Sequence, residues 1–162
     1  MTTFRVAFVD VYVLREGVTG LETLALRRGP GGRCPGAWEV VHGSIEPGEV
    51  PVQAALRELR EETGLAPARC YNLSRVETFY RHTTDEVGLI PVFAVFVGDA
   101  PVRLSAEHDA FEWLPVPAAQ GRLAWPRERR GLEDIQVLLS RGTAGPLDDV
   151  LAVALPPGAA GG

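Results

Sequence analysis

Three glutamates lie close together in a segment whose apolar pattern predicts a helix. Glu58, Glu61 and Glu62 fall at helical spacings, so their carboxylates share one face. Like charges at these spacings repel by roughly a few tenths of a kcal/mol, and a compensating cation is expected. Arg57 is one possible source of that cation, and a bound metal is the other. Carboxylate oxygens without sulfur or imidazole favour Mg²⁺ or Mn²⁺ over zinc.

The helix that positions these glutamates is expected at residues 51–63. Taken alone, its charged run is typical of a solvated helix face held by ion pairs. Pro51 suits the first helical turn, and Gly64 suits the left-handed position after the end. Val50 is a poor N-cap residue, so we expect something other than its side chain to hold the start. The apolar stripe expected to face the core consists of Val52, Ala55, Leu56 and Leu59.

Strand patterns surround this helix on both sides. We expect strands at residues 4–14, 21–28, 38–41, 69–80, 88–97 and 111–114, and a last helix at about 127–141. Strands mixed with two helices predict an α/β or α+β layered fold without internal repeats. Residues 1–155 are expected to form a single domain, followed by a flexible tail of proline, glycine and alanine at 156–162.

Composition excludes several classes of function. All 16 basic residues are arginine, so mechanisms that need a Schiff-base or P-loop lysine are excluded. A net charge of -5 argues against a nucleic-acid partner. Two cysteines without metal-binding spacing fit a reduced, cytoplasmic setting, and no segment has the roughly 18 apolar residues of a membrane span.

The spacing from a glycine-marked turn into the helix follows a known pattern. Gly43 is followed by Glu49, then by Arg57-Glu58-Leu59, Glu61-Glu62 and Gly64-Leu65. The segment resembles, at all nine fixed positions, the 23-residue Nudix hydrolase signature Gly-x5-Glu-x7-Arg-Glu-U-x-Glu-Glu-x-Gly-U, where U is aliphatic. This match outweighs the interpretation as a solvated helix face.

The resemblance implies both a fold and a metal site. The fold it implies is an α/β/α sandwich in which a mixed sheet lies between helices. Glu61, Glu62 and the Gly43 carbonyl are then expected metal ligands, and Glu58 is a further ligand or the base for the attacking water. Such a site would hold Mg²⁺ or Mn²⁺ against a diphosphate.

Two other residues of the signature are expected to support this site. By the same resemblance, Glu49 pairs with Arg57 and orients the helix. No covalent enzyme intermediate is implied, so the absence of lysine is consistent with this chemistry.

The similarity extends beyond the signature toward the branch that contains dihydroneopterin triphosphate pyrophosphatase. Residues 38–49, the Glu107-His segment before Trp113 and a second tryptophan, Trp125, resemble that branch. Glu107 is thereby implied as a distant metal ligand or catalytic base. The branch usually carries asparagine where this chain has Glu128.

Five further residues are candidates for substrate contact. They are Arg27, Arg28, Trp38, Tyr80 and Trp125. An arginine could clamp phosphate, although surface solubility is an equal explanation. Tyr80 and the tryptophans could stack on a flat ring, although hairpin or core packing explains them as well. His42 is expected to be a positioned loop residue.

These features predict a metal-dependent Nudix pyrophosphohydrolase acting on a small phosphorylated molecule. Dihydroneopterin triphosphate or a nucleoside triphosphate is the leading substrate, and a dinucleoside polyphosphate is the alternative. A catalytically idle Nudix module for sensing or binding is a third possibility, although such modules commonly lose one of the glutamates retained here. The oligomeric state is expected to be monomer or homodimer.

Overall fold

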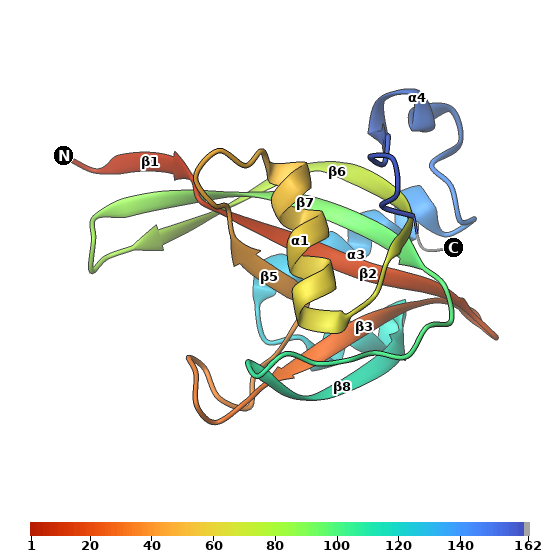
Figure 1. The fold of residues 1–162 in the computed structure, drawn as a ribbon, viewed down its shortest axis with the longest axis horizontal. Coiled ribbons are helices and arrows are strands. Elements are labelled where there is room, and N and C mark those ends of the chain that lie inside the picture. The colour runs from red at the N-terminus through yellow and green to blue at the C-terminus, as the bar shows by residue number, and fades with distance from the viewer. Residues whose placement is uncertain (161–162) are drawn as a thin grey trace.

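The computed structural model describes residues 1–160, which build one mixed sheet with helices on both faces (Figure 1). The strands are β1 (Thr3–Val6), β2 (Phe8–Gly17), β3 (Gly20–Arg28), β4 (Trp38–Glu39), β5 (Val41–Ser44), β6 (Pro67–Arg81), β7 (Glu86–Val97), β8 (His108–Pro115) and β9 (Ala152–Val153). The helices are α1 (Pro51–Thr63), α2 (Val116–Arg122), α3 (Pro126–Leu139), the short 3₁₀ turn η1 (Gly145–Leu147) and α4 (Asp148–Leu151).

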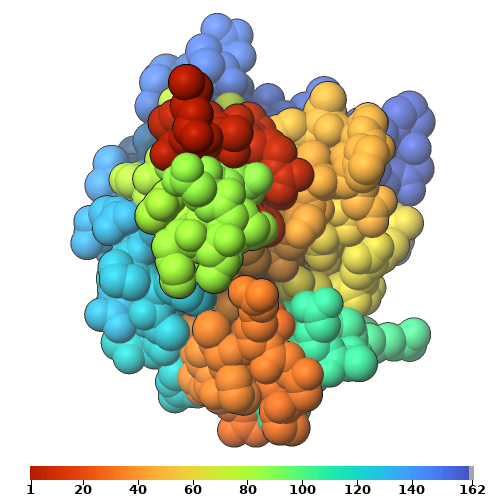
Figure 2. Space-filling view, turned by 90° about the vertical axis from the view of Figure 1, so that its left-hand side faces the viewer, coloured from red at the N-terminus to blue at the C-terminus, as the bar shows by residue number. Residues whose placement is uncertain are grey.

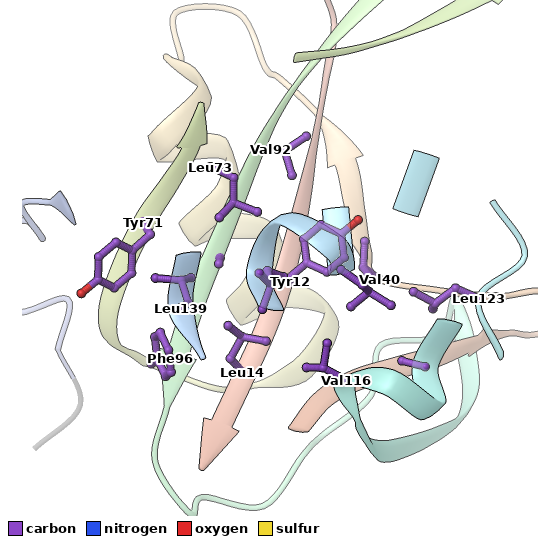
Figure 3. Close-up of a cluster of buried hydrophobic side chains, with 14 of the residues drawn as sticks. Tyr12, Leu14, Val40, Tyr71, Leu73, Val92, Phe96, Val116, Leu123 and Leu139 are labelled. Atoms are coloured by element: carbon purple, nitrogen blue, oxygen red, sulfur yellow. The ribbon is translucent and has the colours of Figure 1, made fainter. Parts of the chain in front are cut away.

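The sheet separates two hydrophobic clusters. On one face α1 packs Ala55 and Leu59 against Val9, Val11 and other side chains of the central strands. On the opposite face α2 and α3 cover a cluster that includes Tyr12, Leu14 and Leu139 (Figure 3). Helices therefore lie on both sides of a mixed sheet, which confirms the expected α/β sandwich.

One edge of β2 pairs with two different strands. Its first half, from Phe8 to Val11, pairs with β5, and its last residues, from Leu14 to Gly17, pair with β3. The two neighbours diverge from this shared edge, and the sheet splits between them. Val40 carries the chain across the split from β4 to β5. The split provides the opening in which the acidic residues collect.

A long hairpin projects from the sheet on the other side of β2. Strands β6 and β7 pair along most of their length, and β1 adds to the outer part of β7 in parallel (Figure 1). The register places Tyr80, Val87 and Phe4 in one cross-strand row and Phe79 beside Gly88 in the next. Because neighbouring residues of a strand point to opposite faces, Phe79 and Tyr80 lie on different sides of the hairpin.

Most elements agree with the expectations, and several differ. The single strand expected at 38–41 is wrong, because the chain leaves the strand at Val40 and continues as β5 to Ser44. The expected strand at 4–14 is wrong as a single element, because the chain breaks at Ala7 and β1 pairs separately with β7. Four further elements were not expected, because each is too short to give a clear periodic pattern of apolar residues. They are α2, η1, α4 and β9. The single-domain boundary and the flexible tail remain predictions, and residues 161–162 lie outside the described part.

No helix within residues 1–160 combines the length and the apolar character needed to cross a membrane.

Candidate active site

Helix α1 has the expected bounds and is held at both ends. Val50 makes no side-chain cap; instead its amide donates to the Gln53 side chain at 3.0 Å. Gly64 ends the helix in the left-handed conformation with φ 71°, and its amide donates to Arg60. Ala55 and Leu59 are buried as expected, whereas Val52 and Leu56 of the expected stripe are only half-buried.

The three glutamates of α1 differ greatly in exposure. Glu62 is 3% exposed, although it was expected to share an open polar face. Glu58 is half-buried, and the Glu61 side chain is 56% exposed. The carboxylates therefore range from core to solvent along one side of the helix.

Arg57 binds most of the acidic groups that surround it. Its Nε donates to Glu49 Oε1 at 2.7 Å, and one Nη donates to Glu58 at 2.8 Å and to Glu61 at 3.2 Å. The other Nη donates to the Ser44 carbonyl at 2.8 Å. The hydrogen bonds from Arg57 lower the pKa of Glu49. These contacts tie α1 to the turn before it and fit the expected supporting roles of Glu49 and Arg57.

A hollow of about 250 Å³ opens beside α1 at the split in the sheet. Its lining includes Phe8, Arg28, His42, Gly43, Glu58 and Glu107. The β6–β7 hairpin (green), the loop after β3 (orange) and the segment before β8 (teal) face the viewer at this end of the molecule (Figure 2). Residues separated by up to about a hundred positions in sequence are thus brought together around one space.

A larger depression lies elsewhere and has a different character. It measures about 470 Å³ and lies between the start of α1 and strands β6 and β7, where Val50, Val76 and Phe93 contribute to its lining. No acidic residue lines it. Size therefore does not identify the chemical site, whereas the acidic lining of the smaller hollow does.

Gly43 and Glu58 approach each other so closely that a side chain at position 43 would displace the Glu58 carboxylate. A Cβ at Gly43 would lie 1.9 Å from the carboxyl carbon of Glu58 and 2.1 Å from Oε1. Glycine at this position therefore lets the backbone of β5 lie against the carboxylate. The arrangement offers backbone and carboxylate oxygens on one side of the hollow.

Burial and like charge act together on the Glu62 carboxyl. Burial raises the pKa of Glu62 to about 9, and the negative charges of Glu58, Glu39 and Glu107 act in the same direction. Its Oε2 atom is buried without a hydrogen-bond partner in the described chain. Burial also raises the pKa of Glu58, even though Arg57 opposes this shift. Burial is the largest cause of both pKa shifts.

Side chains alone do not yet enclose a metal site. Within residues 1–160 no three histidine, cysteine or acidic side chains converge closely enough to hold an ion. Glu58 and Glu61 instead point to Arg57. Even so, the buried, unpartnered oxygen of Glu62 and the oxygen-rich surface at Gly43 and Glu58 fit a hard divalent cation.

Arg28 connects the hollow to a second buried acid. Its Nη1 donates to Glu39 at 3.1 Å and lies 3.9 Å from Glu107, whose side chain is 61% exposed. His108 also contacts Glu39, at 3.2 Å. Burial raises the pKa of Glu39, but its hydrogen bonds to His108 and Arg28 outweigh this and lower the pKa below the ordinary value. Glu39 therefore anchors Arg28 as an anion.

The other substrate candidates do not line the hollow. Arg27 points to the opposite side of β3 from Arg28 and bonds Asp109 at 2.7 Å. Trp38 has the guanidinium groups of Arg27 and Arg122 near its ring, at 5.9 Å and 4.8 Å. Tyr80 donates to Asp85 in the hairpin turn at 3.0 Å. Their proposed contacts with substrate remain predictions.

Comparison with known proteins agrees with this geometry. The family model of the NUDIX domain matches residues 4–135, which include every element from β2 to the first part of α3. The chain belongs to the Nudix family.

Individual Nudix and other relatives add detail. An octanoyltransferase from Myxococcus xanthus is 42% identical over 123 residues, covering 71% of this chain and 32% of that protein. The asymmetrical bis(5'-nucleosyl)-tetraphosphatase of Mus musculus is 34% identical over 88 residues, covering 51% of this chain and 58% of that protein. The chain thus spans less than two thirds of either relative.

A solved structure shares the Nudix fold. The E. coli dihydroneopterin triphosphate pyrophosphohydrolase superposes with a TM-score of 0.66 at 22% identity, covering 85% of this chain and 99% of that one. At this identity the likeness shows the fold alone.

Sequence reasoning missed a buried charge cluster beside the Nudix motif. Asp10 is 1% exposed, its Oδ1 lies 2.7 Å from His42 Nδ1, and its Oδ2 accepts from Arg127 Nε at 2.8 Å. Burial raises the pKa of Asp10, but His42 and Arg127 outweigh burial and lower it. His42 was expected in a loop, but it lies in β5, where its contact with Asp10 positions it. The alternating strand pattern gave no signal for Asp10, because it lies in a run of valines.

Glu128 was noted only as a departure from a family pattern. It is fully buried; its Oε1 accepts from the Val40 amide at 3.2 Å, and its Oε2 has no partner in the described chain. Burial raises the pKa of Glu128 well above the ordinary value, and the charge of Asp10 acts with burial. The group therefore supports the backbone at the sheet split in its neutral form.

Proposed function

We propose that this chain hydrolyses a phosphoanhydride bond in a nucleoside-triphosphate-like molecule, with Mg²⁺ or Mn²⁺ as cofactor. Dihydroneopterin triphosphate and nucleoside or deoxynucleoside triphosphates are the leading substrates. One observation carries the proposal: a hollow lined by Gly43, Glu58 and Glu107 adjoins Glu62, whose buried oxygen lacks a partner. A divalent cation would supply positive charge to these acids and would also bind the oxygens of a polyphosphate.

The glutamates of α1 and the Gly43 carbonyl would hold the metal. The proposed ligand set is Gly43, Glu58, Glu61 and Glu62. When bound, the metal neutralises the diphosphate and lowers the pKa of a coordinated water. Glu61 would turn from Arg57, since its exposed side chain is held there by one contact of 3.2 Å.

The remaining residues hold the site and move the proton. Arg57 and Glu49 fix α1 against the turn that carries Gly43. Glu58 or Glu107 accepts the proton of the attacking water, because both lie at the hollow. Arg28, anchored by Glu39, binds phosphate oxygens from the other side.

A dinucleoside polyphosphate is the second candidate substrate. The murine relative named a bis(5'-nucleosyl)-tetraphosphatase favours it, since the identity of 34% extends over half of this chain. Such a substrate carries the same phosphoanhydride bonds as a nucleoside triphosphate. The two candidates therefore differ in what lies beyond the phosphates.

Two other classes of function have less support. An idle binding module is disfavoured because Glu58, Glu61 and Glu62 are all present. Acyl transfer, suggested by the name of the Myxococcus relative, lacks a suitable nucleophile at the hollow: Cys34 is exposed in a loop, Cys70 is buried, and lysine is absent. A cytoplasmic setting and a monomeric or homodimeric state remain part of the proposal.

A hydrolysis screen tests the proposed function. Nucleoside triphosphates, dihydroneopterin triphosphate and diadenosine tetraphosphate are incubated with the protein and Mg²⁺ or Mn²⁺, and products are identified by mass. Hydrolysis is expected to vanish in chelator and to return with metal. Full activity in chelator, or no hydrolysis of any compound, would contradict the proposal.

A matched pair of variants tests the role of Glu107. Glu107→Gln should lower turnover strongly because its carboxylate lies at the hollow. Glu112→Gln is the control, since Glu112 is bonded to Arg122 on α2 and does not line the hollow. Equal small effects of both variants would exclude Glu107 as ligand or base.

A further inference from the structure

Arg28 reaches the hollow with its guanidinium group already held on two sides. Its Nε donates to the Arg33 carbonyl at 2.6 Å, and its Nη1 donates to Glu39 Oε1 at 3.1 Å. Within residues 1–160 the third nitrogen, Nη2, makes no hydrogen bond, and it is not among the buried atoms that lack one. Nη2 is therefore accessible to solvent and free to donate to a phosphate oxygen.

His108 shares the Glu39 carboxylate with Arg28. Its Nε2 lies 3.2 Å from Glu39 Oε1, the oxygen that Arg28 also bonds, and the His108 side chain is 0% exposed. Because an ionised carboxylate only accepts hydrogen bonds, Nε2 is the donor. Burial raises the pKa of Glu39, and the hydrogen bond from His108 is the largest of the contacts that lower it. His108 therefore helps to keep Glu39 ionised next to Arg28.

A β-bulge brings His108 beside Arg28. Along β3, Arg27 pairs with Ala110 of β8. The next pair is Arg28 with His108, which leaves Asp109 as the extra residue. Asp109 bonds Arg27, and its side chain is 41% exposed. Bulges re-aim side chains next to functional sites, and this one places a buried imidazole where a regular strand would place an exposed acid.

A glycine in the loop between β3 and β4 leaves room beside the guanidinium group. A Cβ at Gly32 would lie 3.1 Å from Arg28 Nη2, which is closer than ordinary van der Waals contact. Its neighbour Gly31 differs, because a Cβ there would meet nothing within 4 Å. Neither glycine has a positive φ. The space next to Arg28, and not the backbone conformation, therefore distinguishes Gly32.

We propose that His108 and Gly32 are positioning residues that direct Nη2 of Arg28 to the substrate phosphates. This assignment rests on the proposed function, in which Arg28 binds phosphate oxygens. His108 fixes one edge of the guanidinium group through Glu39, and the absence of a side chain at Gly32 leaves Nη2 accessible. Neither residue touches the phosphates, so each acts only through Arg28.

Binding of a phosphate probe that resists hydrolysis measures this effect apart from catalysis. The probe is imidodiphosphate with Mg²⁺, and calorimetry gives its dissociation constant. Gly32→Ala should weaken binding by about fivefold, because the methyl group displaces Nη2 from the position where it meets a phosphate oxygen. His108→Leu should weaken binding by about tenfold, because Glu39 loses a hydrogen bond and holds Arg28 less firmly.

Matched variants control for unspecific damage to the loop and to the core. Gly31→Ala adds the same methyl group one residue earlier and should leave the dissociation constant unchanged. His108→Gln keeps a nitrogen donor near Glu39 and should retain most of the affinity that His108→Leu loses. Unchanged binding by Gly32→Ala, or equal losses from Gly31→Ala and Gly32→Ala, would overturn the proposal.

A double-mutant cycle with Arg28→Gln distinguishes positioning from a general effect on the fold. Once the guanidinium group is removed, neither Gly32→Ala nor His108→Leu should weaken imidodiphosphate binding any further. Equal fold-changes in the wild-type and Arg28→Gln backgrounds would overturn the assignment, because the effect would then not pass through Arg28.

The proposed function and this assignment can fail separately. If no compound is hydrolysed in the screen, the proposed function fails, and losses of imidodiphosphate binding that depend on Arg28 still support the positioning roles. If hydrolysis occurs but wild type does not bind imidodiphosphate, or the losses do not depend on Arg28, the assignment fails alone.

Discussion

Glu62 and Glu128 are both buried, and they lie in helices on opposite faces of the sheet. In each, one carboxyl oxygen has no partner in the described chain, and burial raises the pKa. Their surroundings differ. Glu58, Glu39 and Glu107 raise the pKa of Glu62, and Arg28 is the cation that interacts with its charge. Asp10 and Glu39 raise the pKa of Glu128, and the charge of Arg127 opposes them.

This difference shows that burial alone does not define a functional acid. Each carboxyl accepts a backbone N–H, Glu128 from Val40 and Glu62 from His42, but the acids that act on Glu128 do not line the hollow. Glu62 lies beside Glu58 and Glu107, which line the hollow, and either protonation or a cation from solvent relieves their repulsion. Glu62 is therefore expected to act as an anion in the working protein, and Glu128 as a neutral structural group.

The largest expected effect is on catalysis. Glu62→Gln should lower turnover by roughly 100-fold or more, since it removes an anionic ligand from a metal that stabilises the transition state. Glu128→Gln, the same change on the other face, should stay within about threefold of wild type. Steady-state kinetics at saturating metal measure the turnover of both variants. Near-normal turnover by Glu62→Gln would contradict the proposed difference in role between Glu62 and Glu128.

The increase in melting temperature on metal binding should differ between the Glu62 and Glu128 variants. A cation that binds only the folded state stabilises it by mass action, so Mg²⁺ or Mn²⁺ should raise the melting temperature of wild type. Glu128→Gln should retain this increase, and Glu62→Gln should lose most of it. Thermal melts over a metal titration provide the measurement, and equal increases in all three proteins would mean that the ion binds elsewhere.

In metal-free protein the pH dependence of stability should carry the signature of Glu62. Its pKa is raised from 4.5 to about 9 on folding, so folding favours the protonated form. That stabilisation is complete below pH 4.5 and is lost progressively as the pH rises toward 9. Urea unfolding at several pH values should show a flatter dependence for Glu62→Gln than for wild type, and identical slopes would refute this assignment.

The smallest effect is expected from Glu128→Gln on stability. Because the carboxyl is already neutral when folded, an amide of similar shape should change the free energy of unfolding by no more than ~1 kcal/mol. Glu128→Ala should cost more, about 2 kcal/mol or above, because it leaves a cavity and an unpaired Val40 amide. Denaturant unfolding distinguishes them, and a large loss in Glu128→Gln would indicate that the ionised form is needed.

Local patterns predicted the helix of the site better than its surroundings. The bounds of α1 and the pairing of Arg57 with Glu49 follow from short-range spacing and from the family resemblance. The burial of Glu62 could not be predicted. A helical wheel gives the direction in which a side chain points, but it does not show how closely neighbouring strands cover that side chain. The approach of Asp10, His42 and Arg127 depends on strand pairing between distant segments, which carries no local signal.

The aromatic residues show the same limit. Tyr80 was named as a candidate for stacking on a flat ring, yet it is Phe79 that faces Trp125. A change of one residue in strand register moves every side chain to the other face, and only the pairing of β6 with β7 determines which face is which. Trp125 could be identified by residue type, but its partner could not.

The contact between Gly43 and Glu58 also constrains how this protein can evolve. The Glu58 carboxylate occupies the space that a side chain at position 43 would need. Elsewhere in the core, a change in side-chain volume alters packing without altering reactivity. Under the proposed function, a side chain at position 43 would displace a proposed metal ligand, so packing and catalysis would change together.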